Sequence, residues 1–177
     1  MHDPHSPYTN GYHLFLVPDS ETSNKFSSII ESVGATFGSV IFPPHITLLS
    51  GITGDEHELI SYTEQLALAI APRTLTIAGV RTEDRFFRAL YLIVKESGAL
   101  SDMHMNASIA FKTEVSEYLP HLSLLYGNYS DEQKKPMVHL LSPLEGMEFQ
   151  IVKLDLYKTE GEVEAWKKMA SFPLGIS

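Results

Sequence analysis

Two octapeptides of this chain follow one pattern: proline, histidine, an apolar residue, a hydroxyl residue, two leucines, a variable residue and glycine. Residues 44–51 read PHITLLSG and residues 120–127 read PHLSLLYG. Composition alone would give such a match with a probability on the order of 10⁻⁴, and self-similarity of this kind indicates an internal duplication. The repeat therefore predicts a chain folded as two similar lobes, with one copy of the motif in each.

Each copy presents a histidine and a hydroxyl residue two positions apart, His45 with Thr47 and His121 with Ser123. On a β-strand, side chains at positions i and i+2 point to the same face, so the intervening apolar residue faces the core. If the two strands meet at a pseudo-twofold axis, two imidazoles and two hydroxyls converge on one point.

Two imidazoles beside two hydroxyls suit the hydrolysis of a phosphodiester. One neutral histidine can deprotonate a water molecule while the other, protonated, donates to the leaving oxygen. The hydroxyls can donate hydrogen bonds to the non-bridging phosphate oxygens. This chemistry requires no metal ion and no cofactor, and we expect neither. A single strand histidine is more often a surface or core residue, but a pair in matching repeats favours catalysis.

The rest of the chain alternates strand and helix signals. Short apolar and β-branched runs predict strands at residues 13–17, 45–50, 74–80, 86–95, 121–126 and 149–158. Capping and breaking residues predict helices at residues 21–33, 55–70 and 97–111, and a fourth after Ser130, in which Pro136 forces a late start or a kink. Residues 82–85 are typical of a turn between paired strands, which argues against a purely parallel sheet. The fold class is therefore α+β, built as two pseudo-symmetric lobes.

No linker rich in proline or serine separates the two halves, so we expect a single bilobal domain over residues 12–177. Residues 1–11 are polar, contain Pro4 and Pro7, and lack the apolar stretch of a leader, so they are predicted to form a flexible tail. The longest apolar run, residues 89–94, is too short to span a bilayer.

The charge balance, 13 lysine and arginine against 22 aspartate and glutamate residues, gives a net charge of −9. Binding to polymeric nucleic acid depends on clustered basic residues, so we expect no such partner. The chain contains no cysteine, which excludes disulfides, thiolate zinc sites and a cysteine nucleophile. We expect a small-molecule ligand, no association with a membrane, a monomer, and a cytoplasmic location.

The two motifs resemble those of the two-histidine (2H) phosphoesterase superfamily, which is defined by two His-x-Thr/Ser motifs on opposed strands. Within it, the second motif is similar to that of the plant and fungal 2′,3′-cyclic phosphodiesterases, including the tyrosine three places after the serine. The likeness also includes an opening strand ended by Pro18, the pair Phe86–Phe87, the run LYKT at residues 156–159 and the following Trp166. It implies two lobes, each an antiparallel sheet with helices outside, around a water-filled cleft.

The resemblance implies metal-independent hydrolysis of ADP-ribose 1″,2″-cyclic phosphate, a by-product of tRNA splicing, to the 1″-phosphate, and of nucleoside 2′,3′-cyclic phosphates to 2′-phosphates. Carried over to this sequence, it makes His45 and His121 the acid–base pair. We favour His121 as the general base and His45 as the general acid, although the pseudo-symmetry lets a substrate bind in the reverse direction. Thr47 and Ser123 then bind the phosphate, and Tyr126 contacts the substrate. Some fungal relatives are placed at the Golgi, which leaves that compartment open as an alternative.

Aromatic and basic residues are further candidates for binding. Phe15 and Phe87 are candidate stacking partners for the base or sugar by their place in the resemblance, and core packing is the alternative for each. Arg85 and Arg88 flank the two adjacent phenylalanines. For these arginines we favour a solvated strand edge over contact with a second phosphate.

Two other functions remain open at this point. A 2H enzyme acting on RNA ends, with a 2′,5′ ligase-like or terminal phosphodiesterase activity, needs a basic rim, for which this acidic chain has few residues. A non-catalytic module could use the cleft to bind a nucleotide phosphate, although the presence of two intact motifs argues against it.

Overall fold

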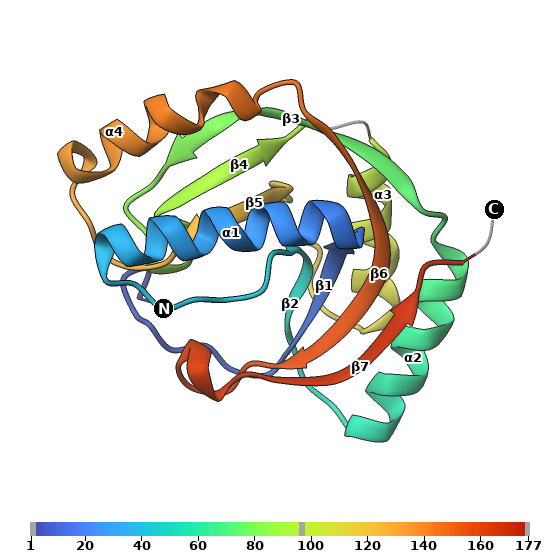
Figure 1. Ribbon diagram of the computed structural model, residues 1–177. Coiled ribbons are helices and arrows are strands. Elements are labelled where there is room, and N and C mark those ends of the chain that lie inside the picture. Colours follow the sequence, from blue (N-terminus) through green and yellow to red (C-terminus); the bar gives the residue numbers. More distant parts are fainter. Residues whose placement is uncertain (1–2, 96–97, 176–177) are drawn as a thin grey trace.

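The computed structural model describes residues 3–95 and 98–175 (Figure 1). Its strands are β1 (Tyr12–Pro18), β2 (Ile46–Ile52), β3 (Arg73–Thr82), β4 (Leu90–Val94), β5 (His121–Leu125), β6 (Glu148–Lys158) and β7 (Lys167–Pro173). Its helices are α1 (Ser20–Phe37), α2 (Glu56–Ala69), α3 (Ala99–Ala110) and α4 (Asp131–Leu141), with 3₁₀ turns η1 (Phe86–Arg88), η2 (Ser142–Leu144) and η3 (Val163–Ala165). None of the helices in the described ranges is long and apolar enough to cross a lipid bilayer.

The strands form one antiparallel sheet in the order β1-β2-β5-β4-β3-β6-β7, and β6 also pairs with β1. The long strand β6 pairs with β3 through residues 148–151 and with β1 through residues 151–158, so the strands close into a ring. The antiparallel sheet and the outer helices confirm the predicted α+β fold class. The predicted strand at residues 86–95 is shorter than expected, because Phe86 donates its N–H to Pro4 and starts the η1 turn.

The two motif strands occupy equivalent places in a repeated order of elements. The series β1-α1-β2-α2 is matched by β4-α3-β5-α4, and β1–β2 and β4–β5 are both antiparallel pairs. The helix inside each series packs against the motif strand of the other, α1 on β5 and α3 on β2 (Figure 1). The two predicted lobes are therefore interlocked, with β2 and β5 adjacent at their junction.

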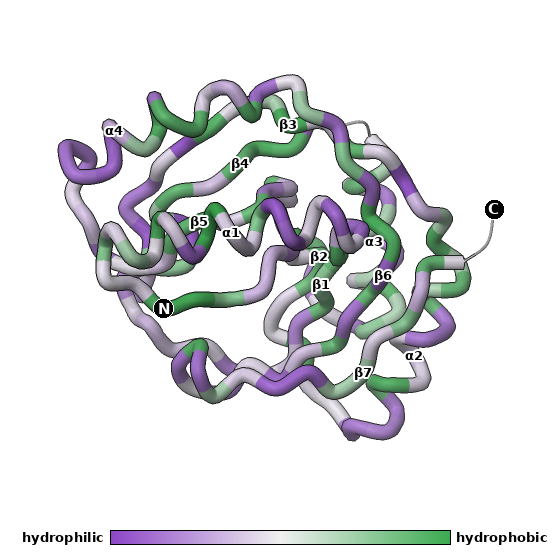
Figure 2. Tube along the Cα trace, in the orientation of Figure 1, coloured by the Kyte–Doolittle hydropathy of each residue, from purple (hydrophilic) through white to green (hydrophobic). Residues whose placement is uncertain are grey.

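Alternation along the strands separates the hydrophobic core from a second, more polar face. On β1, Leu14 and Leu16 belong to the core, while His13 and Phe15 face the opposite side. On β2 and β5 the apolar residue between the histidine and its hydroxyl partner is likewise buried in the core. Burying one leucine or isoleucine contributes about 1.5–3 kcal/mol, so core packing fixes the direction of the polar side chains. Figure 2 shows β4 as a largely hydrophobic strand and the start of α4 as hydrophilic.

Helix α1 is longer than the sequence predicts. It begins after Asp19, whose carboxylate accepts a hydrogen bond from the N–H of Thr22 at 3.0 Å. The predicted end near Gly34 is wrong, because the helix continues to Gly38, which adopts the left-handed conformation with φ of 66°. Gly34 instead allows a close approach, since a Cβ there would lie 2.5 Å from the Cδ1 of Ile41.

Helix α4 begins earlier than its proline predicts. It starts at Asp131, directly after Ser130 as predicted, and contains Pro136, so of the two expected effects of this proline, a late start or a kink, the late start is wrong. A capping box explains the early start: the Ser130 hydroxyl accepts from the N–H of Gln133, and the Gln133 side chain accepts from the N–H of Ser130.

Residues 3–11 lie against the fold, although their composition predicts a flexible tail. Thr9 and Gly161 are joined by two main-chain hydrogen bonds of 3.0 and 3.2 Å. The carbonyl of Pro4 accepts a hydrogen bond from the N–H of Phe86 at 2.9 Å. These main-chain bonds connect positions far apart in sequence, so side-chain composition does not reveal them. The first two residues of the predicted tail lie outside the described residues.

Candidate active site

The two motifs meet where β2 and β5 pair. Ile46 and Leu122, the central residues of the two motifs, are antiparallel partners. In this register each histidine lies across from the hydroxyl residue of the other motif. The pseudo-twofold axis therefore passes between the motifs, and both present their polar side chains to the same face of the sheet.

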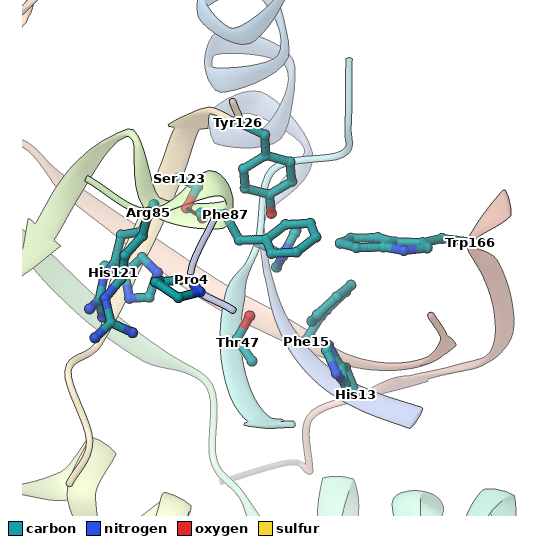
Figure 3. Close-up of a pocket in the computed structure, with 12 residues that line it drawn as sticks. Pro4, His13, Phe15, Thr47, Arg85, Phe87, His121, Ser123, Tyr126 and Trp166 are labelled. Atoms are coloured by element: carbon teal, nitrogen blue, oxygen red, sulfur yellow. Dashed lines mark hydrogen bonds between the residues drawn. The ribbon is translucent and has the colours of Figure 1, made fainter. Parts of the chain in front are cut away.

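A cavity of about 250 Å³ opens over this pair of motifs (Figure 3). The candidate residues from the sequence all line it: Phe15, His45, Thr47, Phe87, His121, Ser123 and Tyr126. Its lining also includes Pro4, His13, Arg85, Arg88 and Trp166. The cavity therefore brings together residues from β1, β2, β5, η1, the N-terminal segment and the loop before β7.

The two histidines are held in matching ways. The Nδ1–H of His45 donates to the carbonyl of Pro43 at 2.7 Å, and the Nδ1–H of His121 donates to the carbonyl of Leu119 at 2.8 Å. A carbonyl can only accept, so Nδ1 carries the proton and Nε2 is left for a ligand. In both motifs the acceptor residue precedes a proline, which favours an extended backbone there. The prolines of the repeat thus help to set the tautomer of each histidine.

Burial makes both imidazoles difficult to protonate. His45 is only 6% exposed, and burial, together with the nearby charge of His121, lowers the pKa of His45 to about 4. The pKa of His121 is also lowered, chiefly by burial, while its hydrogen bond to Leu119 opposes the change. Both side chains are therefore mainly neutral at pH 7 in the free protein.

The two hydroxyls of the motifs differ in their hydrogen bonds. The Ser123 Oγ donates to the carbonyl of Phe87 at 2.9 Å. Among the hydrogen bonds of residues 3–95 and 98–175, none involves the Oγ1 of Thr47, which lines the same cavity. Thr47 can therefore donate to a ligand without breaking a bond within the protein, whereas Ser123 must first give up its bond to Phe87.

Phe15 supports His45 from the adjacent strand. Its side chain is 1% exposed and pairs in register with Thr47. The rings of Phe15 and His45 are stacked, with centroids 3.7 Å apart and planes at 20°. Tyr157 packs against Phe15 as well, at a centroid distance of 4.8 Å. Phe15 therefore fixes the plane of a motif histidine, and little of its ring is left for a base or sugar.

Aromatic side chains form one wall of the cavity (Figure 3). The rings of Phe87 and Trp166 lie 5.9 Å apart at 28°, and Phe87 contacts Tyr126 edge to face at 5.2 Å. Tyr126 in turn stacks on Phe42 at 3.7 Å, and its burial raises the pKa of its hydroxyl. This wall offers an apolar surface to a planar ligand group, with Phe87 and Trp166 on its exposed side.

His13 is a third imidazole of the cavity, which the sequence analysis missed. It lies two residues before Phe15 on β1 and therefore faces the same side. Burial, with the nearby charge of His45, lowers the pKa of His13 to about 4. Strand periodicity could have revealed this residue, because it shares the face of a candidate aromatic residue.

Arg85 and Arg88 do not lie on a strand, which corrects part of our expectation, although the side chain of Arg85 is 60% exposed and therefore solvated. The η1 turn replaces the predicted start of the strand, and both arginines line the cavity. Figure 3 places Arg85 on the side of the cavity away from Trp166.

Known proteins share the motifs and the fold described above. The family model described as "Cyclic phosphodiesterase-like protein" matches residues 11–174. The chain belongs to this family. A curated relative, the cyclic phosphodiesterase of Arabidopsis thaliana, is 30% identical over 174 residues, which cover 90% of this chain and 92% of the relative.

Solved structures share the fold at low sequence identity. TT0787 of Thermus thermophilus superposes with a TM-score of 0.62 at 14% identity, covering 94% of this chain and 98% of TT0787. LigT of Escherichia coli, in its complex with 3′-AMP, gives a TM-score of 0.60 at 16% identity, covering 94% of this chain and 98% of LigT. The fold is that of the 2H phosphoesterases, as the resemblance implies.

Membership of this family makes the protein an enzyme of the cyclic phosphodiesterase kind, a hydrolase, rather than a non-catalytic binding module. Within the part of the chain that the structure describes, no group of three or more histidine, cysteine, aspartate or glutamate residues could hold a metal ion. The groups that this cyclic phosphodiesterase places in its cavity are imidazoles, hydroxyls, guanidinium groups and aromatic rings.

Proposed function

We propose that this cyclic phosphodiesterase hydrolyses cyclic phosphates of ribose: nucleoside 2′,3′-cyclic phosphates to 2′-phosphates, and ADP-ribose 1″,2″-cyclic phosphate to the 1″-phosphate. The observation that carries the proposal is the pairing of Ile46 with Leu122, because it brings both motifs to one cavity. The net charge of −9 favours a small ligand over an RNA polymer. The complex of LigT with 3′-AMP supports a ligand of nucleotide size.

The proposed reaction forms one bond at phosphorus and breaks another. The Nε2 of the base takes a proton from water, and the water oxygen attacks the phosphorus. The P–O bond to the leaving ribose oxygen breaks, and that oxygen takes a proton from the acid. Thr47 and Ser123 donate to the non-bridging oxygens. For a 2′,3′-cyclic phosphate the P–O3′ bond breaks, which leaves a 2′-phosphate and a free 3′-hydroxyl.

Burial favours His45 as the base and His121 as the acid, the reverse of the roles favoured from the sequence. His45 is the more buried of the two, so it is the less easily protonated side chain in the free enzyme. A phosphodiester anion in the cavity raises the pKa of both imidazoles, and the more exposed His121 then takes the proton more readily.

The activity of the enzyme is tested by incubating it with adenosine 2′,3′-cyclic phosphate and with ADP-ribose 1″,2″-cyclic phosphate. We expect phosphorus NMR to detect a 2′-phosphate from the first and a 1″-phosphate from the second. Release of a 3′-phosphate would show that the other P–O bond breaks. If neither compound reacts, while an unrelated phosphodiester does, the proposed substrate class is wrong.

The lowered histidine pKa values predict an acidic pH optimum for kcat/KM. The base must be neutral, so the rate falls as the pH drops through the pKa of the base. The acid must be protonated, so the rate falls as the pH rises through the pKa of the acid. Because both pKa values lie below the usual 6.5, we expect a bell-shaped profile with its maximum below pH 6.5. A flat profile from about pH 5 to 8 would contradict the histidine pair.

Removal of metal ions is expected to leave the activity intact. Exhaustive dialysis against EDTA should change kcat/KM by less than about twofold, because the imidazoles and hydroxyls supply proton transfer and charge stabilisation. Steady-state assays before and after dialysis measure the effect. A loss of activity that a divalent cation restores would assign the reaction to a metal-assisted mechanism instead.

A further inference from the structure

A cationic cluster lies at the edge of the cavity next to one of the motif histidines. Arg85 and Arg88 line the same cavity as His45, Thr47 and His121. Figure 3 shows the Arg85 side chain on the same side of the cavity as His121, while Trp166 and Phe15 lie on the far side. A ligand bound over the two motifs therefore has an aromatic wall on one side and guanidinium groups on the other.

One carboxylate partly neutralises the two arginines. Arg88 donates from Nε and Nη2 to the Oε2 of Glu83 at 2.9 and 2.6 Å, and the Nε of Arg85 lies 3.5 Å from the same oxygen. The other oxygen of Glu83 accepts a hydrogen bond from the Tyr91 hydroxyl at 2.8 Å. Two positive charges thus share one negative charge, and the cluster keeps a net positive charge in a chain whose total is −9.

Several main-chain bonds hold the turn that carries the arginines. The N–H of Arg88 donates to the carbonyl of Arg85 at 3.1 Å, and Gly127 donates to the carbonyl of Phe86 at 2.8 Å. The buried Lys134 donates from Nζ to the carbonyl of Glu83 at 2.9 Å. The guanidinium groups are therefore presented by an anchored turn, and a ligand need not order that turn when it binds.

We propose that Arg85 and Arg88 form a second phosphate subsite, which binds a phosphate group of the substrate other than the cyclic one. A cyclic phosphodiester carries a single negative charge, and in the proposed reaction it lies over the motif histidines and hydroxyls rather than at the arginines. The Nη1 atoms of both arginines make none of the hydrogen bonds found among the described residues, and guanidinium groups bind phosphate oxygens strongly. The preferred substrate is then a ribose cyclic phosphate that bears an additional phosphate or diphosphate. This inference rests on the proposed function.

The test compares adenosine 2′,3′-cyclic phosphate with the same compound carrying a 5′-phosphate. For the unmodified enzyme we expect kcat/KM to be at least about tenfold higher with the 5′-phosphate, in line with a hydrogen bond to a charged group. Arg85→Gln should bring that ratio close to one. Arg88→Gln should also lower the ratio. Because Arg88 lies near His121, this substitution also acts on the rates with both substrates, so the ratio of the two kcat/KM values is the quantity to compare. Arg73→Gln, an exposed arginine at the start of β3, is the matched control and should leave the ratio unchanged.

Each alternative outcome has a distinct meaning. A ratio near one for the unmodified enzyme, or one that Arg85→Gln leaves unchanged, overturns the second subsite but leaves the proposed function intact. Arg85→Gln could raise the inhibition constant of inorganic phosphate and leave the substrate ratio unchanged. The arginines would then bind a free anion rather than the substrate, which also overturns the proposal. If neither substrate is hydrolysed, the proposed function fails, and calorimetry with 2′-AMP and adenosine 2′,5′-bisphosphate decides the subsite. Equal affinity for these two would then overturn it.

Discussion

Replacing His45 or His121 by alanine is expected to lower kcat/KM for adenosine 2′,3′-cyclic phosphate by at least about 10²-fold. Each substitution removes one of the two proton-transfer groups that the motifs bring together at the β2–β5 pair. Steady-state kinetics measure the loss, and circular dichroism verifies that the fold is unchanged.

The pH profiles of the residual activities assign the two roles. The variant that lacks the base should lose the acidic limb of the profile, and the variant that lacks the acid should lose the alkaline limb. We expect His45→Ala to lose the acidic limb and His121→Ala the alkaline one. The opposite pattern would support His121 as the base and His45 as the acid, the roles favoured from the sequence.

An exposed histidine outside the cavity provides the matched control. His139 lies on the surface of α4 and is absent from the lining of the cavity, so His139→Ala should retain full activity. Normal turnover in either His45→Ala or His121→Ala would contradict the two-histidine mechanism. A comparable loss in all three variants would indicate a general effect of losing a histidine rather than a catalytic one.

The positions of the two motifs could be predicted from sequence because they depend on local geometry. The side-chain alternation of a strand places His45 beside Thr47 and His121 beside Ser123, whatever the rest of the fold does. The repeat supplied the remaining step, since two equivalent strands related by a pseudo-twofold axis bring both pairs to one place. The pairing of β2 with β5 bears out this reasoning.

The rest of the cavity depends on contacts between distant segments, which a single sequence does not encode in any local pattern. Arg85 and Arg88 reach the cavity because the η1 turn interrupts the expected strand. Pro4 reaches it because main-chain hydrogen bonds tie the N-terminal segment to Phe86. Phe15 lines the cavity, but its stacking on a histidine is a matter of packing between β1 and β2.

Boundaries of helices were predicted less well than their existence. A glycine inside a helix usually suggests its end, but Gly34 lies under Ile41, where a larger residue would not fit without movement. Pro136 suggested a late start or a kink of α4, yet the capping box at Ser130 allows the helix to begin at Asp131. In both cases a specific contact outweighed the average preference of the residue.

Thr47→Val is expected to lower kcat/KM by about 10²-fold, the loss that typically follows removal of one preorganised donor to a developing negative charge. Valine keeps the shape of threonine and removes only the hydroxyl. Because that hydroxyl makes none of the hydrogen bonds found in residues 3–95 and 98–175, we expect the free energy of unfolding to change little. Urea unfolding and steady-state kinetics on the same preparation separate the two effects.

Ser123→Ala should behave differently, although Ser123 is the equivalent residue of the other motif. Its hydroxyl already donates to the carbonyl of Phe87, so a gain from binding phosphate is offset by the loss of that bond, and we expect a decrease in kcat/KM of only about tenfold. Removing the hydroxyl leaves the carbonyl without this donor, which should lower the free energy of unfolding by about 1–3 kcal/mol. Thr47→Val would then affect catalysis alone, and Ser123→Ala both catalysis and stability. Thr47→Val and Ser123→Ala could instead lower kcat/KM equally and leave the same free energy of unfolding. That result would mean that the substrate breaks the Ser123–Phe87 hydrogen bond at no cost in free energy and that the two motifs contribute symmetrically.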